Sequence, residues 1–285
     1  MPAVTLIQQP DRLQMAAFEG YVRQVFPRAS FAAWMAWGEW NEDYRALALM
    51  AGAEIIANVS LTRMQLLLDG NMVPAWQLGA VGVLPQWRGQ GLSRQLMEAA
   101  LSLTANDPVL LFANDKVRDF YPRFGFAPCP TATFVAEYAC DPGQHPAPAL
   151  PTEAATTRAL IHDLAESGLA STRRFGARGY GRTLTWYLAN RWVPDPRQLD
   201  SHTLVFCRTD GDCLVIDDIL SAKPFDLDAA LPRLISSPIR RIRFGFTPEL
   251  CWPRACTIGT DDDAHLFVRG FMPETPQRFP VLART

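Results

Sequence analysis

The spacing of apolar residues changes several times along the first half of the chain, and each change predicts a new element. Apolar residues recur with a helical period over residues 11–26, and over residues 31–40 the same period predicts a second, shorter helix. Residues 45–50 and 54–68 are predicted to be strands. The second strand runs into Asp69-Gly70-Asn71, a hairpin signal between two apolar runs.

The rest of this half alternates strands with helices. Residues 76–83 are nearly continuous in apolar side chains, as in a strand buried on both faces. The elements predicted after it are, in chain order, a helix over 92–104, a strand over 109–113, a short helix over 114–121 and a closing strand over 133–138. This order predicts an α/β fold with a mixed sheet.

A proline-rich segment at residues 141–151 divides the chain, because four prolines in eleven residues are incompatible with a helix or a central strand. We therefore predict two domains, 1–140 and 152–285, joined by this linker. The second half shows a similar but weaker order, with helices over 153–166, 184–192 and 226–235 and strands over 203–208, 213–220, 241–246 and 265–269. A degenerate structural repeat is a hypothesis that rests on element order alone.

Composition narrows the class of protein. The 285 residues carry a net charge of −2, which argues against a nucleic-acid partner. The six cysteines contain no C-x-x-C pair and are expected to be reduced. No apolar run approaches the length of a membrane span, so a soluble cytoplasmic protein without a membrane partner is expected.

The turn Gln86-Trp87-Arg88-Gly89-Gln90-Gly91 lies between a predicted buried strand and an amphipathic helix. Two glycines permit a sharp bend and a close approach to a ligand, and the free amides at the start of a helix attract an anion such as a pyrophosphate. Arg88 and Arg94 would add charge nearby. A plain strand-to-helix turn is the alternative, and the spacing is neither a dinucleotide fingerprint nor a nucleotide P-loop.

Two motifs in this half resemble the signatures of the GNAT superfamily of N-acetyltransferases. The first signature has Gln or Arg, then Gly three positions later, then Gly or Ala two positions after that. Gln86, Gly89 and Gly91 match it. The second, Asn followed seven residues later by Tyr and then by Gly-Phe, is met by Asn114, Tyr121 and Gly125-Phe126. The resemblance covers residues 44–138 well and residues 1–43 only by element order.

The resemblance implies a GNAT-like acyl-CoA N-acyltransferase fold, acetyl-CoA as cosubstrate and no metal. The pyrophosphate would lie on the amides of residues 88–93, and the pantetheine arm would pair with the backbone of residues 81–83, which would also offer an amide to the oxyanion. The residues assigned to the cosubstrate are Val81, Gly82, Val83, Arg88, Gly89, Gln90, Gly91, Leu92, Ser93, Asn114 and Tyr121.

Tyr121 would protonate the leaving thiolate, the alternative being an aromatic side chain on a core-facing stripe. Asn114 would either contact the pantetheine or cap the helix that follows it. Pro122 lacks an amide hydrogen and is predicted to end that helix at Tyr121, which departs from the family pattern.

The general base is not identified by the sequence, because residues 1–144 contain no histidine. Glu54 is the catalytic candidate that would border the cleft, with Glu39, Glu42 and Asp43 as further candidates. Each of these carboxylates also fits a solvated surface charge. By likeness to some multi-domain relatives, the carboxylate at Thr285 would enter the cleft.

Two features bear on the acceptor. Trp34, Trp37 and Trp40 recur at a spacing of three where the family builds the acceptor wall, although such a stripe also suits a core. Residues 1–141 carry 10 basic and 13 acidic side chains, a balance of −3 that favours a cationic amine. The acceptor class implied is a small-molecule or peptide amine.

The second half carries only partial likenesses to a site. Residues 175–181 contain three glycines but follow no predicted buried strand, so a flexible loop is expected. After the strand at 213–220 stands Ser221-Ala222-Lys223-Pro224-Phe225, without a glycine. The histidines at 162, 202 and 265 lack metal-ligand spacing with the cysteines, and Asp261-Asp262-Asp263 fits a polar turn better than a calcium loop.

A tandem GNAT layout with one active and one degenerate half is therefore predicted, in which the second half shapes the acceptor pocket or a homodimer contact. The leading function is acetyl transfer from acetyl-CoA to an amine by direct attack. The alternative is a catalytically silent protein that binds acyl-CoA as a sensor.

Overall fold

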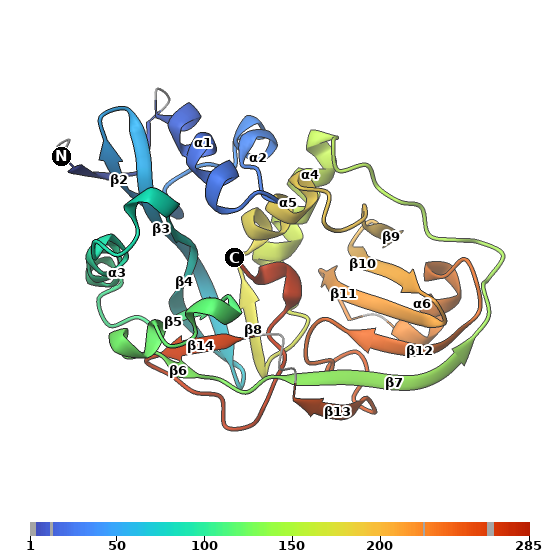
Figure 1. The fold of residues 1–285 in the computed structure, drawn as a ribbon. Coiled ribbons are helices and arrows are strands. Elements are labelled where there is room, and N and C mark those ends of the chain that lie inside the picture. The colour runs from blue at the N-terminus through green and yellow to red at the C-terminus, as the bar shows by residue number, and fades with distance from the viewer. Residues whose placement is uncertain (1–3, 12–13, 225, 261–264) are drawn as a thin grey trace.

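The computed structural model describes residues 4–11, 14–224, 226–260 and 265–285. Its strands form two sheets, as Figure 1 shows. The first sheet contains β1 (Val4–Gln8), β2 (Tyr44–Ala51), β3 (Glu54–Leu68), β4 (Asn71–Val83), β5 (Val109–Phe112), β6 (Ala127–Pro128), β8 (Phe175–Arg178) and β14 (Leu266–Arg269). The second contains β7 (Ala132–Cys140), β9 (Arg197–Asp200), β10 (Thr203–Asp210), β11 (Cys213–Ser221), β12 (Ile239–Phe244) and β13 (Cys256–Thr260).

Both sheets are mixed, as predicted for an α/β protein. The first has the order β1-β2-β3-β4-β5-β14-β6, with β8 beside β3, and only β4 and β5 run parallel among its pairs. The second has the order β13-β7-β12-β11-β10-β9, with β11 and β12 parallel. The hairpin at residues 69–71 is confirmed, since Asp69 and Gly70 take φ values of 45° and 84° between β3 and β4.

Helices cover the sheets and fill the space between them (Figure 1). The α-helices are α1 (Met15–Val25), α2 (Ala32–Ala36), α3 (Leu92–Leu103), α4 (Ala155–Ser167), α5 (Gly181–Ala189) and α6 (Leu227–Leu234). Four 3₁₀ turns are η1 (Pro85–Trp87), η2 (Asp115–Val117), η3 (Tyr121–Phe124) and η4 (Val281–Ala283). No helix in the described ranges combines the length and the apolar character that a bilayer crossing requires.

Each half of the chain contributes at least one strand to the sheet of the other half, which the sequence did not predict. β7 was expected to close the first sheet, but it pairs with β12 in the second. β14, from the end of the chain, pairs with β5 in the first sheet. An apolar run identifies a strand but not its partner, so this exchange is invisible to local pattern reading.

The predicted loop at residues 175–181 is also wrong. Residues 175–178 form β8, which pairs with β3 from Gln65↔Arg178 to Leu68↔Phe175. Gly176 serves close packing, since a Cβ atom there would lie 2.7 Å from the carbonyl oxygen of Thr172. A glycine that signals a loop in the sequence is here a requirement of a buried strand.

The halves share one of their cores. One cluster of buried side chains fills the first sheet and its helices, and another lies beneath the second sheet. A third joins them, with Leu66 from β3, Leu184 from α5, Phe206 from β10 and the fully buried Phe279. Burial of apolar surface between the sheets holds α5 in place against α4, α2 and η4.

Candidate active site

The first sheet opens where β4 and β5 separate. The two strands pair from Trp76↔Val109 to Leu78↔Leu111, and beyond Leu78 no described residue of β4 pairs with β5. The register of β4 against β3 shifts in the same region, between Asn58 and Ser60, and Ala80 takes a φ of 48°. The side-chain nitrogen of Asn58, Nδ2, donates to the Ala80 carbonyl at 3.0 Å and supports this bulge.

The glycine turn that begins α3 has the geometry predicted for an anion site. Gly89 and Gly91 both take a φ of 77°, and a Cβ atom at either would meet no atom within 4 Å. Their role is thus to adopt left-handed backbone and to leave open space. The amides of residues 89–94 have no acceptor among the described residues. Arg88 donates from Nε to the Val83 carbonyl at 3.2 Å and ties the turn to the end of β4.

The predicted helix at residues 114–121 is wrong, since this segment contains only the short 3₁₀ turn η2, and a second one, η3, begins at Tyr121. Asn114 caps the first, because its side-chain oxygen accepts from the Lys116 amide at 3.3 Å. The prediction that Pro122 ends a helix at Tyr121 is wrong, since η3 begins at Tyr121 and Pro122 occupies its first turn, where a missing amide hydrogen costs nothing. Gly125 closes η3 with a φ of 79°.

Tyr121 is buried and lies in the wall of a cavity at the separation of β4 and β5. Removal from water raises the pKa of its phenol from 10.0 to about 12. The group therefore stays protonated across the physiological range. Asn114 lines the same cavity, and its side-chain nitrogen has no acceptor among the described residues.

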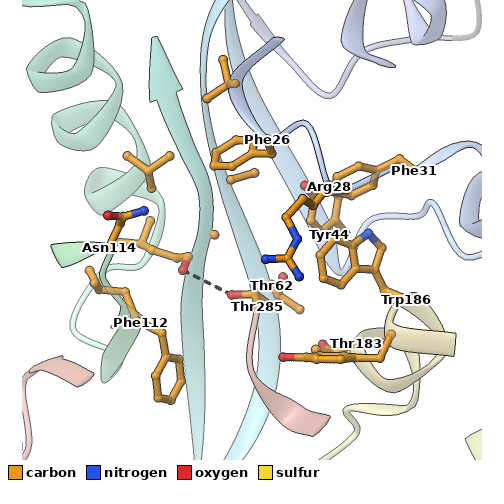
Figure 2. Close-up of a pocket in the computed structure, with 18 of the residues that line it drawn as sticks. Phe26, Arg28, Phe31, Tyr44, Thr62, Phe112, Asn114, Thr183, Trp186 and Thr285 are labelled. Carbon is orange, nitrogen blue, oxygen red and sulfur yellow. Dashed lines mark hydrogen bonds between the residues drawn. The ribbon is translucent and has the colours of Figure 1, made fainter. Parts of the chain in front are cut away.

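The cavity has a volume of about 530 Å³ and extends from the separated strands to α5 (Figure 2). Nine of its 24 lining residues are aromatic. Phe26, Phe31 and Trp34 come from the first half, whereas Trp186, Tyr187 and Trp192 come from α5 and the segment after it. A chamber of this size with few polar groups suits a small organic ligand.

The second half also reaches the cavity through its last residues. Gln77, fully buried in β4, donates to the Ala283 carbonyl at 2.8 Å and accepts from the Thr285 amide at 2.7 Å. The Thr285 hydroxyl donates to the Leu78 carbonyl at 3.2 Å (dashed in Figure 2). Gly79 permits this contact, because a Cβ atom there would lie 2.8 Å from the Thr285 hydroxyl oxygen. Thr285 thus lines the cavity.

The remaining predicted site residues lie apart from this chamber or only at its edge. Val81 lines the cavity, whereas Gly82 allows α1 to approach β4, since a Cβ atom there would lie 2.5 Å from the Val25 side chain. Glu54 is exposed at the start of β3 and borders a separate hollow with residues of α1. The structure therefore does not bring Glu54 together with Tyr121.

The other candidate bases form part of the contact between the halves. The expectation that Glu39 is solvated is wrong, because it is buried and its carboxylate lies 2.7 Å from His162 Nε2 and 3.4 Å from Arg182 Nη1. Asp43 lies 3.8 Å from Arg182 Nε, and Glu42 is exposed. Among the described residues, no Asp, Glu or His side chain lines the cavity.

The charge of the cavity wall is opposite to that expected from the first half as a whole. Its ionic side chains in the described part of the chain are Arg28 and Arg182. Arg182 is paired with Glu39 and Asp43, whereas Arg28 has neither an ion pair nor a hydrogen bond with any described residue. The cationic acceptor favoured by the balance of −3 finds no acidic side chain in this wall.

The tryptophan stripe divides among three places. Trp34 lines the cavity and donates from Nε1 to the Arg182 carbonyl at 2.9 Å. Trp37 packs toward the second half beneath Arg158, whose guanidinium carbon lies 4.5 Å from the ring centre. Trp40 belongs to the core beside Phe18. The core interpretation holds for Trp40, whereas Trp34 packs in the core and also lines the cavity.

Metal-ligating clusters are not found in the described residues, in which no group of three or more His, Cys, Asp or Glu side chains is placed to hold an ion. The three aspartates at 261–263, considered above as a polar turn or calcium loop, lie outside the described residues.

Comparisons with known proteins identify the first half. Residues 5–129 match the model of the acetyltransferase (GNAT) domain. No curated protein matches the sequence. Among solved structures, the chain is similar to Eis1 from Mycobacterium abscessus, with a TM-score of 0.59 and 16% identity over 94% of this chain and 73% of that one.

Two further structures have similar figures. A conserved protein of unknown function from Enterococcus faecalis gives a TM-score of 0.59 with 15% identity, over 94% of this chain and 72% of that one. A GCN5-related N-acetyltransferase from Anabaena variabilis gives 0.53 with 16% identity, over 93% and 72%. At such identities the likeness shows the fold, which extends over both halves.

Proposed function

Because residues 5–129 form an acetyltransferase domain of the GNAT superfamily, we propose that this protein is an N-acetyltransferase that moves an acetyl group from acetyl-CoA to an amine. The observation that carries the proposal is one continuous cavity. It has the separated strands and Tyr121 at one end, and an aromatic chamber built by both halves at the other.

The cosubstrate would extend from the glycine turn before α3, which lies outside the cavity wall, along the edge of β4 to the strand end of the cavity. The unpaired amides of residues 89–94 and the open space above Gly89 and Gly91 suit a pyrophosphate. Arg88 adds charge beside it. The unpaired edge of β4 beyond Leu78 would hold the pantetheine arm and offer an amide to the developing oxyanion.

Transfer follows by direct attack in this proposal. The amine nitrogen bonds to the thioester carbon, the C–S bond breaks, and Tyr121 supplies the proton with which the sulfur leaves as a thiol. The proton lost by the amine returns to Tyr121 through water. Tyr121 keeps its proton until this moment because its pKa is about 12.

No acidic or imidazole side chain of the described wall is available as a base. We therefore propose that the amine attacks in its neutral form. The rate at subsaturating acceptor should rise about tenfold per pH unit below the pKa of the amine. It should not fall again by pH 10, because burial holds the pKa of Tyr121 at about 12. A plateau beginning near pH 5 would instead point to a carboxylate base and contradict this assignment.

We also propose that residues 152–285 form a degenerate GNAT-like domain that follows the linker at 141–151 and shapes the acceptor chamber. The order of β10, β11 and β12, with α6 before a parallel strand, supports this reading. Arg182, Trp186 and Thr285 are the contributions of this half to the cavity.

The test has two steps on the full chain. Calorimetry with CoA should show binding below about 1 mM ligand, within the usual range for enzyme substrates. Release of CoA thiol from acetyl-CoA is then followed against a panel of amines. Failure of CoA to bind would refute the proposal. Binding without turnover of any amine would favour the alternative, an acyl-CoA sensor, for which the absence of Asp, Glu and His side chains from the described wall is the supporting observation.

A further inference from the structure

The acceptor end of the cavity contains one cation without a partner. Figure 2 shows the Arg28 side chain, from the segment after α1, turned into the space between Thr62 and Trp186. Arg182, the other cation of this wall, is neutralised by Glu39 and Asp43. No carboxylate of the described residues lies within ion-pair distance of Arg28. Its charge is thus available to a ligand.

Two buried donors beside Arg28 also lack acceptors. Thr62 is 7% exposed and lines the cavity, and its hydroxyl has no hydrogen-bond partner in the described structure. The indole nitrogen of Trp186, in the opposite wall, has none either. A buried donor without an acceptor costs about 1–3 kcal/mol, so the Thr62 hydroxyl and the Trp186 indole, which line the same cavity as the exposed Arg28, are best explained by a ligand that accepts from them.

The rest of this space is apolar and aromatic. Phe31 and Trp186 lie 5.7 Å apart between ring centres, and Trp192 packs on Trp186 at 4.7 Å. These rings offer flat surfaces to a large apolar body. A polycationic acceptor is disfavoured here, because the described wall offers it no acidic side chain and carries the unpaired cation of Arg28.

From these observations we propose that the acceptor is an aromatic or large apolar amine that carries a carboxylate, of the α-amino acid kind. Arg28 binds the carboxylate with the help of Thr62 and Trp186, and the aromatic chamber holds the side chain. The planar fork of a guanidinium matches a carboxylate better than any neutral group. This assignment rests on the proposed acetyl transfer and adds the class of its substrate.

The test compares acceptors that differ only at the carboxylate. Tryptophan and phenylalanine are measured beside tryptamine, phenethylamine and the two amino acid amides, with acetyl-CoA saturating. The amides have more acidic ammonium groups than the amino acids, and the decarboxylated amines have less acidic ones. If kcat/KM is about tenfold or more higher for the amino acids than for the amides and for the decarboxylated amines, the difference comes from recognition of the carboxylate. Amine basicity cannot explain it, because the two comparison groups differ from the amino acids in opposite directions.

Variants of Arg28 assign this preference. Arg28→Gln should lower kcat/KM for the amino acids by about 10-fold to 100-fold and leave the decarboxylated amines nearly unchanged. Arg173→Gln is the matched control, because Arg173 is exposed and does not line the cavity. Equal losses for both acceptor types, or equal use of both by the unaltered protein, would overturn the assignment.

A binding measurement separates this assignment from the proposed catalysis. N-acetyltryptophan and N-acetyltryptamine are titrated into the CoA-bound protein and into its Arg28→Gln variant. Tighter binding of the acid, lost in the variant, supports the assignment even if no acceptor is turned over, in which case only the proposed transfer fails. Equal binding of the two compounds, or binding of neither, overturns the assignment whatever the turnover.

Discussion

Each half of the molecule has a pair of parallel strands that separate, and the two gaps differ in what fills them. In the first half β4 and β5 separate after Leu78 and Leu111, and the gap opens into the cavity. In the second half β11 and β12 separate after Ile216 and Phe244. There the chain itself fills the gap, since the Gly245 amide donates to the Ile216 carbonyl at 2.7 Å and the Gly245 carbonyl accepts from Val281 at 2.9 Å.

Packing closes the second gap completely around Gly245. A Cβ atom at this residue would lie 2.5 Å from the Asp217 carbonyl oxygen and 2.8 Å from the Val281 side chain. A pantetheine arm cannot enter a space in which even a methyl group does not fit.

The helices that follow β4 and β11, α3 and α6, also differ in whether their N-terminal ends leave room for a ligand. At α3 the cap is Gly91, which has no side chain, and the first amides are unpaired. At α6 the cap is Asp226, whose carboxylate accepts from the Ala229 amide at 3.2 Å, and Asp228 adds a second negative charge in the first turn. The second half thus supplies its own anion where the first half leaves room for one.

The comparison shows that the order of the strands does not by itself produce an open cavity between them. Both halves have the parallel pair and the helix, but only one has glycines at the cap and no chain in the gap. The second half has a different part in the cavity, because it supplies residues of α5 and Thr285 to the wall.

The largest expected effect concerns Tyr121, the buried tyrosine that lies beside the separated strands. Tyr121→Phe should lower kcat by about 10²-fold to 10⁴-fold, because the leaving sulfur loses its proton donor, while the affinity for CoA stays nearly constant. The measurement is steady-state thiol release with calorimetry of CoA. A loss of less than threefold would return Tyr121 to the role of a core aromatic residue.

Tyr180→Phe provides the contrast in the second half. Tyr180 donates to the buried Asp218 carboxylate at 2.6 Å and does not line the cavity. Removing its hydroxyl should lower the free energy of unfolding by about 1–3 kcal/mol, because Asp218 loses a donor, and should leave kcat within about threefold. If both variants lose activity equally, the contrast between the halves fails.

The next largest effect is expected from a substitution that gives α3 the same N-cap residue type as α6. Gly91→Asp places a carboxylate at the start of α3, as Asp226 does at α6, and Asp is among the residues that best tolerate left-handed backbone. The variant should fold, yet its dissociation constant for CoA should rise about 100-fold, because its own anion competes with the pyrophosphate. Calorimetry and thermal unfolding measure both quantities.

Gly91→Asn is the matched control for backbone strain. It has nearly the same shape as the aspartate variant without the charge, so it should lose much less CoA affinity. Equal losses in the two variants would mean that conformation, and not charge, sets the requirement for glycine at this cap.

Much of the first half could be predicted from local sequence. The strands at 54–68 and 109–113, the helix from residue 92 and the glycine turn before it could all be predicted, because each depends on neighbours in the chain. The family resemblance that these motifs supported is confirmed by the domain match over residues 5–129.

The aromatic part of the cavity could not be predicted in the same way. Arg28 and Trp186 are 158 positions apart, and nothing local to either marks a pocket. The exchange of β7 and β14 between the sheets and the burial of Glu39 against His162 likewise depend on long-range pairing. The local sequence offered one hint of this packing, the glycines at 176 and 181. They predicted a loop, but in the structure they allow close approach to Thr172 and His162.

A smaller effect is expected where the halves meet. Glu39→Ala removes the carboxylate that holds His162 and Arg182, and so loosens α4 and α5 against the first half. It should lower kcat/KM for the acceptor about tenfold through misplacement of α5, with CoA affinity unchanged. It should also cost about 1–2 kcal/mol of stability, because both partners are partly exposed.

Glu42→Ala serves as the control, since Glu42 is exposed in the same loop and was an equal candidate from the sequence. It should leave both quantities unchanged. If Glu39→Ala weakens CoA binding as much as acceptor use, the division of labour between the halves is incorrect.

The smallest effect concerns Asn114, the second residue after β5, where the second half has the fully buried Phe246 in the corresponding place after β12. Asn114 caps η2 with its oxygen and leaves its nitrogen free toward the cavity. Asn114→Ser keeps a capping oxygen but loses the amide donor, whereas Asn114→Ala loses both. We expect the serine variant to raise the KM for acetyl-CoA about threefold to tenfold, the value of one neutral hydrogen bond. A serine variant with unaltered KM, beside an impaired alanine variant, would reduce Asn114 to a cap and leave the cavity of the first half defined by its backbone alone.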